Sequence, residues 1–320
     1  MRVFSLTIIG LILGASCLTG QSPDVQTRPT FRAGIDLVAM SVVVRDRAGR
    51  SVRGLSRADF ELFDSGQRRP IVQFSAEPAG ASVAVLLDIS GSMAVAGKLA
   101  DAQAAMAHLV SWLHADIDEV ALFTFDSTLR EVHPFAPATS DVTRQVPSLR
   151  AFGTTSLYDA IAQVGQRVAA RQHLRRVVVV VTDGVDTSST RSAPEVARLV
   201  GAIDVPVYVV AVVTPLDRPS EAARLPGASP VSAGPALAAV AEQTGGLLFV
   251  ASAPAHASLA ARQIAAELHS SYQMAFEPGR ESGWHAVTLR SRRTGLLVRT
   301  RSGYVAGTNP THEPLTTHQK

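Results

Sequence analysis

The sequence predicts an α/β protein built on a doubly wound, mainly parallel sheet, with a small β-sandwich beside it. Two observations predict the sheet: continuous apolar runs of strand length recur through residues 82–251, and segments of helical periodicity separate them. Apolar strands without polar alternation are typical of parallel strands that helices cover on both faces. A third observation predicts the sandwich, because short alternating runs separated by glycine turns stand on either side of this region.

The first 20 residues have the pattern of a signal peptide. Arg2 precedes an apolar run at residues 3–13, and a polar stretch begins at Gln21. This run is shorter than the roughly 20 residues that span a bilayer, and no other stretch approaches that length. We therefore expect residues 1–20 to be cleaved and the mature chain, without a transmembrane span, to be secreted or to lie in the periplasm or cell envelope. Cleavage before Cys17, the single cysteine, is the alternative and would leave a thiol for a lipid anchor.

Residues 33–78 are expected to form an N-terminal β segment. The β-branched run at 35–44 and the turn sequence DRAG at 46–49 predict a hairpin. The sequence LSRADF predicts a short helical turn that begins at a serine, and strands are expected at 60–63 and 71–75. So few strands cannot bury a face by themselves.

Residues 81–271 are expected to form the α/β domain. The predicted strands lie at residues 82–88, 119–125, 129–135, 176–183, 205–213 and 247–251. The predicted helices lie at residues 98–113, 140–149, 157–171, 193–203, 235–244 and 255–271. Strands and helices that alternate in this way form βαβ units, which give a mainly parallel sheet with helices on both faces. The strand at 129–135 is the more polar one, which suits a sheet edge, and Trp112 and Phe152 are expected in the core.

Residues 272–306 are expected to form a C-terminal β segment. Because domain termini usually lie close together, we expect this segment to pair with residues 33–78 into one small sandwich, with the α/β domain inserted between them. Its arginines are expected on the solvated faces of the strands: Arg290, Arg292, Arg293, Arg299 and Arg301. The polar residues 307–320 are expected to be a disordered tail.

Charge and histidine spacing argue against two kinds of site. The 30 lysines and arginines and the 27 acidic residues leave a formal charge of +3, and the basic residues are scattered, so no nucleic-acid partner is expected. The nine histidines show no metal-ligand spacing. His108, His114, His133 and His173 are isolated along the chain and are interpreted as surface or satisfied residues.

Three polar clusters are expected at one rim of the sheet. The sequences DISGS at 88–92 and TDG at 182–184 follow predicted strands, and GTTS at 153–156 precedes a predicted helix. In an open parallel sheet, ligands bind beyond the carboxyl ends of the strands. Carboxylates and hydroxyls without a nearby His or Cys suit a hard divalent cation, Mg²⁺ first, with Mn²⁺ or Ca²⁺ as alternatives.

Each of these polar residues also has an explanation without a metal. The DISGS sequence alone could cap a helix or form a turn. Asp126 is interpreted as a turn residue, and Asp159 and Asp186 as capping acids.

The three clusters together resemble the metal-ion-dependent adhesion site of von Willebrand factor type A (VWA) and integrin I domains. DISGS is similar to the DxSxS of that site, GTTSLYDAI to its threonine loop and VVTDG to the strand end with its second aspartate. The resemblance implies a Rossmann-like fold and a divalent cation held directly by Ser90, Ser92 and Thr155 and partly through water by Asp88 and Asp183. The loop spacing matches Thr155 rather than Thr154 to the family threonine.

The flanks extend this resemblance to roughly residues 33–306. The sequences VVVRDRAGRSVRGLSRADFELFDSGQRRPI and VRTRSGYVA are similar to the flanks of a bacterial group of secreted VWA-related proteins. That group is defined by sequence more than by biochemistry, so its partners do not follow from the resemblance.

The predicted function is that of an exported, metal-dependent binding module for adhesion or assembly. The resemblance implies that the cation keeps one position open for an Asp or Glu carboxylate of a protein partner. One alternative is a metal-assisted hydrolase, but no His, Lys or third carboxylate lies near enough in sequence to these clusters to be assigned as a general base, and the chain contains neither a GxSxG elbow nor a P-loop. The chain is therefore not expected to be an enzyme. The other alternative is a vestigial metal site with binding by the sandwich, against which the complete set of five residues argues.

Overall fold

The computed structural model describes residues 37–144, 146–214, 217 and 234–307. The predicted signal peptide, Cys17 and residues 308–320 of the predicted tail lie outside these residues. No helix in the described part of the chain is both long enough and apolar enough to cross a membrane.

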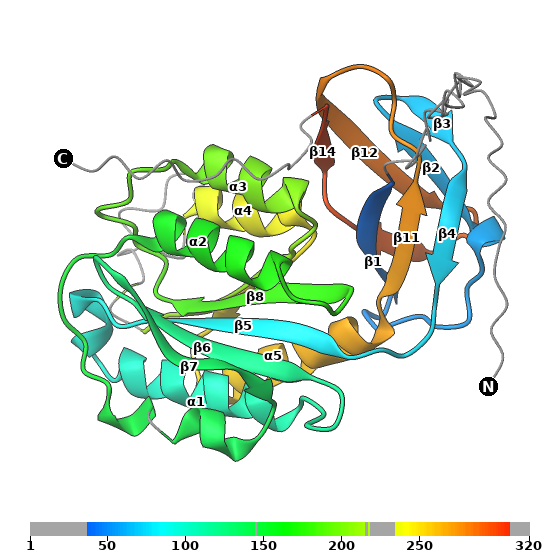
Figure 1. The fold of residues 1–320 in the computed structure, drawn as a ribbon. Coiled ribbons are helices and arrows are strands. Elements are labelled where there is room, and N and C mark those ends of the chain that lie inside the picture. Colours follow the sequence, from blue (N-terminus) through cyan, green and yellow to red (C-terminus); the bar gives the residue numbers. More distant parts are fainter. Residues whose placement is uncertain (1–36, 145, 215–216, 218–233, 308–320) are drawn as a thin grey trace, which may run out of the picture. The chain divides into compact units, whose positions relative to one another are not determined.

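The central sheet has six strands, ordered β10-β9-β8-β5-β6-β7 (Figure 1). Their bounds are Ala81–Asp88 (β5), Glu119–Phe125 (β6), Leu129–Pro137 (β7), Arg175–Thr182 (β8), Val207–Val212 (β9) and Leu248–Ala251 (β10). Neighbouring strands from β10 to β6 are parallel, and β7 pairs antiparallel with β6 at one edge. The predicted doubly wound, mainly parallel sheet with a polar edge strand is confirmed.

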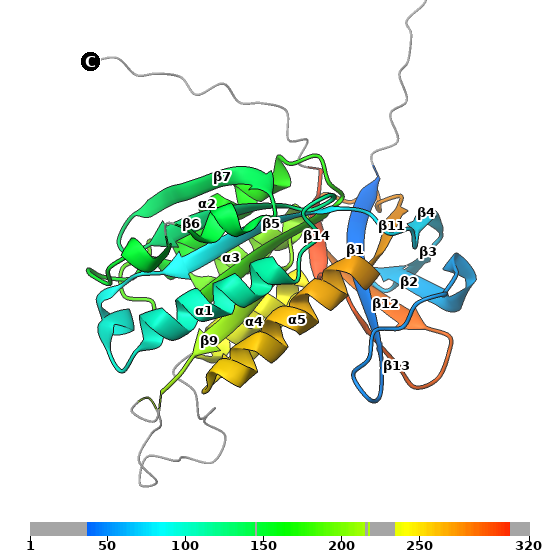
Figure 2. The ribbon, with the colours of Figure 1, turned by 90° about the horizontal axis from the view of Figure 1, so that it is seen from below.

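Five α-helices cover the two faces of this sheet (Figures 1 and 2). Lys98–Ser111 (α1) and Pro254–Ser270 (α5) lie on one face, and Leu157–Ala169 (α2), Ala193–Ala202 (α3) and Pro235–Thr244 (α4) lie on the other. Side chains of a strand alternate between these faces. In β5, Val85 belongs to the core under α1 and α5, whereas Leu86 belongs to the core under α2, α3 and α4. Burial on both faces explains why these strands are continuously apolar.

The predicted helix at residues 140–149 is wrong. The chain forms two short 3₁₀ turns there, Ser140–Thr143 (η3) and Val146–Ser148 (η4). Pro147 lies inside the predicted helix and has no backbone N–H to donate to the preceding turn. The apolar residues of this segment still face the core: Val142 and Val146 are buried there, and Leu149 packs against it.

The flanking segments together build two four-stranded antiparallel sheets, ordered β13-β1-β11-β4 and β14-β12-β2-β3. The N-terminal strands are Val38–Asp46 (β1), Phe60–Asp64 (β2), Gln67–Arg69 (β3) and Ile71–Ser75 (β4), and the 3₁₀ turn Arg57–Asp59 (η1) precedes β2. The C-terminal strands are Tyr272–Phe276 (β11), Gly283–Ser291 (β12), Leu296–Arg299 (β13) and Gly303–Ala306 (β14). Both sheets contain strands of both segments and share one hydrophobic core. The predicted sandwich is confirmed.

The hairpin predicted at residues 35–49 is short, because its second arm pairs with β1 only at residues 50–52. Along most of its length β1 instead pairs with C-terminal strands, with β11 through residues 38–42 and with β13 through residues 43–46. The two arms are joined by the bridge between Arg45 and Ser51 and by backbone hydrogen bonds from Asp46 to Arg50 and from Val52 to Val44. Local turn signals thus identified the turn correctly, whereas the pairing of β1 with distant C-terminal strands could not be read from them.

For two of the arginines, the prediction of a position on a solvated strand face is wrong, because both side chains contact the α/β domain. Arg301 is 3% exposed and donates hydrogen bonds to the carbonyl oxygens of Gly201 and Ala202 at the end of α3. Arg299 forms an ion pair with Glu267 of α5, which is fully buried. These contacts join the last strands of the sandwich to two helices of the α/β domain.

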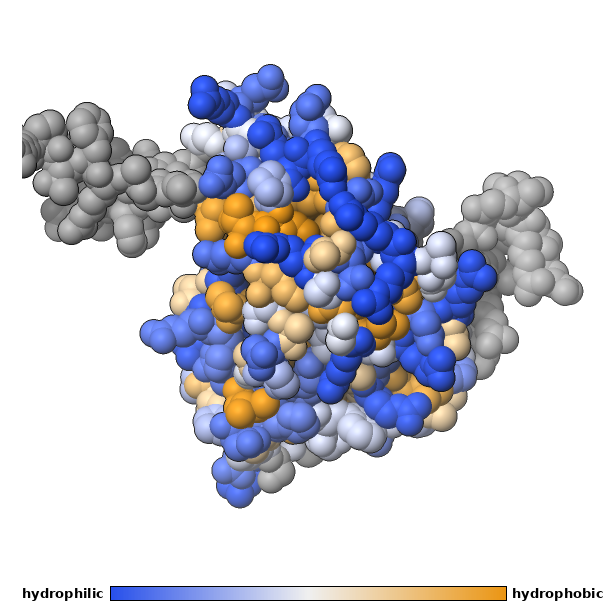
Figure 3. All heavy atoms as spheres, turned by 90° about the vertical axis from the view of Figure 1, so that its right-hand side faces the viewer, coloured by the Kyte–Doolittle hydropathy of each residue, from blue (hydrophilic) through white to orange (hydrophobic). Residues whose placement is uncertain are grey.

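Hydrophobic side chains reach the surface of the sandwich in several places. Figure 3 shows hydrophobic patches between hydrophilic side chains on the side that lies to the right in Figure 1. Val72, Trp284 and Leu297 of the sandwich strands are 36%, 43% and 65% exposed. Scattered exposure of this kind is ordinary for a folded domain and identifies no site.

Candidate metal centre

The DISGS loop begins where strand β5 ends. Asp88 is fully buried; its Oδ1 accepts a hydrogen bond from the Ser90 backbone N–H at 2.8 Å, and its Oδ2 accepts one from the Thr182 hydroxyl at 2.5 Å. The hydroxyl oxygens of Ser90 and Ser92 lie 3.1 Å apart. The loop thus turns one carboxylate and two hydroxyls toward the same space.

The threonine loop is fastened to the DISGS loop by backbone hydrogen bonds. Gly91 donates to the carbonyl oxygen of Gly153 at 2.9 Å, and Phe152 donates to that of Ile89 at 2.8 Å. Gly153 has a φ of 88°, a conformation that favours glycine. Two residues later, Thr155 is 3% exposed, whereas Thr154 is exposed to solvent. The inward position therefore belongs to Thr155.

Asp183 follows strand β8 and is buried beside Lys98, the first residue of α1. Its Oδ2 lies 3.1 Å from the Lys98 ammonium nitrogen, which also lies 2.7 Å from Oδ1 of Asp217. Lys98 is 4% exposed. Lys98 was not among the site residues predicted from the sequence. A sequence signal existed, because a lysine at the start of a helix opposes the helix dipole and needs a local reason.

Burial and neighbouring charges set the protonation of these groups. Burial raises the pKa of Asp88 to about 6, against hydrogen bonds from Thr182 and Ser90 that favour the ionised form, and nearby Asp183 adds to the rise. Burial disfavours the charged form of Lys98, but its bonds to Asp217 and Asp183 outweigh burial and raise its pKa. The centre thus holds an ammonium and a carboxylate that is costly to ionise.

The chemistry of the donor set fits a hard divalent cation. Asp88, Ser90 and Ser92 are joined by hydrogen bonds, the loop of Thr155 is tied to theirs, and Asp88 interacts electrostatically with Asp183. All five side chains offer oxygen, which Mg²⁺, Mn²⁺ and Ca²⁺ prefer. A bound cation would also offset the cost of ionising Asp88.

Of the other rim acids, Asp126 has the turn role and Asp186 the capping role expected of them, whereas Asp159 binds a loop and not a helix end. Asp126 accepts hydrogen bonds from the backbone and the hydroxyl of Thr128. Asp186 accepts one from the backbone of Leu157, the first residue of α2. Asp159 binds the backbone of the loop that precedes α3, at Thr190. These contacts hold the loops around the rim in place.

Each of the three site loops carries an exposed apolar side chain. Phe152, Val95 and Val185 are 81%, 48% and 39% exposed, and each lies within three residues of a candidate ligand. The prediction of a core position is wrong for Phe152 and also for Trp112, which is 45% exposed. The backbone of Phe152 is hydrogen-bonded to that of Ile89, which keeps this residue on the rim loop.

Comparison with known proteins identifies the α/β domain. The family model described as von Willebrand factor type A domain matches residues 83–185. No curated protein matches the chain.

Several solved structures are similar in fold. An aerotolerance-related membrane protein from Bacteroides fragilis is 22% identical, with a TM-score of 0.47 over 59% of this chain and 98% of its own. A von Willebrand factor type A protein from Catenulispora acidiphila is 14% identical, with a TM-score of 0.49 over 86% and 75%. Proximal thread matrix protein 1 from the mussel byssus, with a zinc-occupied MIDAS motif, is 15% identical, with a TM-score of 0.46 over 63% and 48%. By its family match and its sheet topology, the α/β domain of this chain is a von Willebrand factor type A domain.

Proposed function

We propose that this VWA domain binds a divalent cation at Asp88, Ser90, Ser92, Thr155 and Asp183 and uses it to bind an acidic residue of a protein partner. The observation that carries the proposal is the pair of Ser90 and Ser92 hydroxyls, 3.1 Å apart, next to the buried carboxylate of Asp88. VWA domains typically bind a divalent cation at such a site and often act in protein binding or adhesion. Mg²⁺ is the proposed ion, and Mn²⁺ and Ca²⁺ suit the same oxygens.

The five proposed ligands have two roles: the hydroxyls would contact the ion directly, and the carboxylates would balance part of its charge. Ser90, Ser92 and Thr155 would contribute neutral hydroxyl oxygens, while Asp88 and Asp183 act partly through bound water. Neutral ligands leave much of the ion's charge uncompensated, so a carboxylate from a partner is attracted strongly in this partly desolvated place. A neutral ligand would bind poorly there.

The exposed apolar side chains support a protein as the partner. Phe152, Val95 and Val185 stand on the three loops that carry the candidate ligands. Exposed apolar residues around a charged anchor suit a protein interface, because the contacts that surround an anchoring residue exclude water from it. A small free acid would leave these side chains unused.

Binding is favoured over hydrolysis by the state of Lys98. It is the lysine nearest to the candidate ligands among the described residues, and it is held between Asp183 and Asp217 with a raised pKa. An ammonium engaged in this way does not serve as a general base at neutral pH. We therefore propose a binding module, exported to the cell envelope or secreted as its signal-peptide pattern predicts.

Capture of partners from an envelope extract of the native host tests the proposal. The full mature chain should retain a partner in Mg²⁺ and release it in EDTA. Asp88→Ala should lose both the cation, measured by calorimetry, and the partner. Phe152→Ser should bind the cation normally but lose most of the partner, whereas Trp112→Ser, an equally drastic change at an exposed site on α1's C-terminal side, should lose neither. Capture that persists in EDTA, or in Asp88→Ala, would refute the metal-dependent mechanism.

A further inference from the structure

The structure brings together two histidines and an aspartate at the end of the sheet opposite to the proposed cation site. His114 and Asp118 lie between α1 and β6, and His269 lies in the last turn of α5. One ligand atom of each lies within 4.8 Å of those of the other two. Asp118 precedes β6, whereas Asp88 ends the parallel strand β5, so roughly 25 Å of strand separates the two places.

Asp118 is the rigid member of this cluster. It is 2% exposed; its Oδ1 accepts a hydrogen bond from the backbone of Ala81 at 2.9 Å, and its Oδ2 accepts one from the backbone of His114 at 2.8 Å. His269 Nε2 also lies 2.8 Å from Oδ2. Burial disfavours the charged carboxyl, but these hydrogen bonds outweigh burial, and the pKa of Asp118 is lowered. The carboxylate is therefore ionised and fixed in position.

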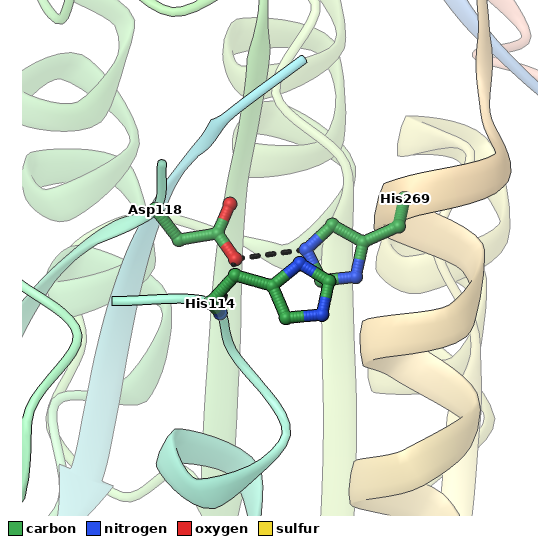
Figure 4. A group of neighbouring side chains, drawn as sticks. All are labelled: His114, Asp118 and His269. Atoms are coloured by element: carbon green, nitrogen blue, oxygen red, sulfur yellow. Dashed lines mark hydrogen bonds and ion pairs between the residues drawn. The ribbon is translucent and has the colours of Figure 1, made fainter. Parts of the chain in front are cut away.

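The two imidazoles lie face to face beside this carboxylate (Figure 4). Their ring centroids are 4.3 Å apart and their planes differ by 5°. His269 is half-buried and His114 is exposed, so solvent reaches the cluster from the side of His114. An ion pair of His269 with Asp118 would by itself fasten α5 to the start of β6. The second imidazole adds a third donor that this fastening does not need, although its ring, now parallel to that of His269, has to turn before lone pairs of both rings point at one ion.

We propose that His114, Asp118 and His269 form a second metal site, which binds Zn²⁺ or a similar first-row transition ion. Two imidazoles and one carboxylate suit such an ion, in contrast to the oxygen-only set at the other end of the sheet. In a tetrahedral zinc site, ligand atoms lie roughly 3.4 Å apart, so the cluster has to close by roughly 1.5 Å. Rotation of the exposed His114 side chain supplies that movement while the buried Asp118 stays in place.

The site would hold the junction between the two domains. His269 is two residues before Ser271, and Tyr272 begins strand β11 of the sandwich. A metal bound to His269 and to the loop before β6 fixes the last turn of α5 against the sheet. Because a ligand that binds only the folded state stabilises it, zinc should raise the melting temperature of the protein.

The test measures Zn²⁺ binding to the full mature chain carrying Asp88→Ala, so that the proposed magnesium site does not compete. Calorimetry should find one equivalent of zinc in this background. Adding His114→Ala should lower the affinity for zinc at least tenfold and abolish the rise in melting temperature. The control is His108→Ala, which replaces an exposed histidine of α1 and should change neither the affinity nor the melting temperature. Because His114 is exposed, its loss does not threaten the fold as loss of the buried Asp118 would.

A second titration, with Co²⁺ in excess Mg²⁺ and with the magnesium site left unsubstituted, distinguishes the proposed zinc site from the proposed magnesium site. Co²⁺ should give the visible absorption of a tetrahedral site with the unchanged chain and with His108→Ala, but not with His114→Ala. Zinc that binds at the magnesium site would be insensitive to His114. Absence of zinc binding in the Asp88→Ala background, or equal affinity with and without His114, would overturn the second site and leave the first untouched.

Discussion

The ammonium nitrogen of Lys98 lies 3.1 Å from Oδ2 of Asp183. The same carboxylate belongs to the set proposed to hold the divalent cation. Lys98 also contacts Asp217 at 2.7 Å, so one buried positive charge is shared by two acids. A cation bound near Asp183 would meet this charge at short range, so we expect Lys98 to lower the affinity of the proposed site for the cation.

Lys98→Met should raise the affinity for Mg²⁺ by about tenfold, because it removes a positive charge next to Asp183 without changing the length of the side chain much. Lys98→Arg is the matched control and should leave the affinity close to that of the unchanged protein. Calorimetric titration of the three proteins decides the point. An equal or weaker affinity in Lys98→Met would show that the lysine does not oppose the cation.

Cation binding should depend on pH through Asp88. Its pKa is raised to about 6 by burial, and the cation needs the ionised carboxylate. The affinity for Mg²⁺ should therefore be constant well above pH 6 and fall by about tenfold per pH unit below it. Titrations at about pH 5, 6 and 7.5 measure this slope. An affinity that is the same at the lowest and highest pH would exclude Asp88 as the controlling group.

The ion-free protein should show the opposite trend in stability. The folded state binds the Asp88 proton more tightly than the unfolded state, where the pKa is near 3.8. The unfolded chain therefore holds fewer protons at this group between about pH 4 and 6, and the contribution of Asp88 to stability falls as the pH rises through that window. Asp88→Asn should lack this contribution. Urea unfolding of both proteins in EDTA measures the difference, and parallel curves for the two proteins would contradict it.

Thr155→Ala should weaken Mg²⁺ binding by about tenfold, roughly 1.4 kcal/mol, while Thr154→Ala should change it less than twofold. The reason is that Thr155 is buried in the site loop and Thr154 faces solvent, where its hydroxyl accepts a hydrogen bond from Ser188. Calorimetry on the two variants provides the comparison. The reverse order would mean that the threonine ligand is one residue earlier.

Deletion of residues 272–320 should remove the protection of the amides in β1 from hydrogen exchange. Strand β1 has β11 on one side and β13 on the other, and both belong to the deleted segment. What remains is too few strands to bury the hydrophobic face of β1. Exchange measured by mass spectrometry on residues 38–46 tests this, with the amides of β5 as the internal reference. Native protection of β1 in the truncated chain would be incompatible with the shared sandwich.

Predictions from sequence were most accurate where a signal is local. Strands β4 and β6 and helix α4 begin and end at the residues that the apolar pattern predicts. The reason is that the buried faces of a strand or helix require apolar residues at positions close together in the sequence. The polar clusters could be placed on one rim for a related reason. The carboxyl ends of parallel strands share an edge, and the order of strands and helices predicts a parallel sheet.

Contacts between distant segments were decided only by the tertiary structure. Asp183 pairs with Lys98, 85 residues earlier, and His269 of α5 stacks on His114, which lies between α1 and β6. The side chain of Arg299 pairs with the buried Glu267, although the sequence pattern of its strand predicts that it faces solvent. No local periodicity encodes such pairs, since a charge at a strand position is equally compatible with water and with a buried partner. The sequence by itself therefore determined the elements and the candidate oxygen ligands, while packing of the sandwich against the α/β domain decided which charges are buried and which histidines meet.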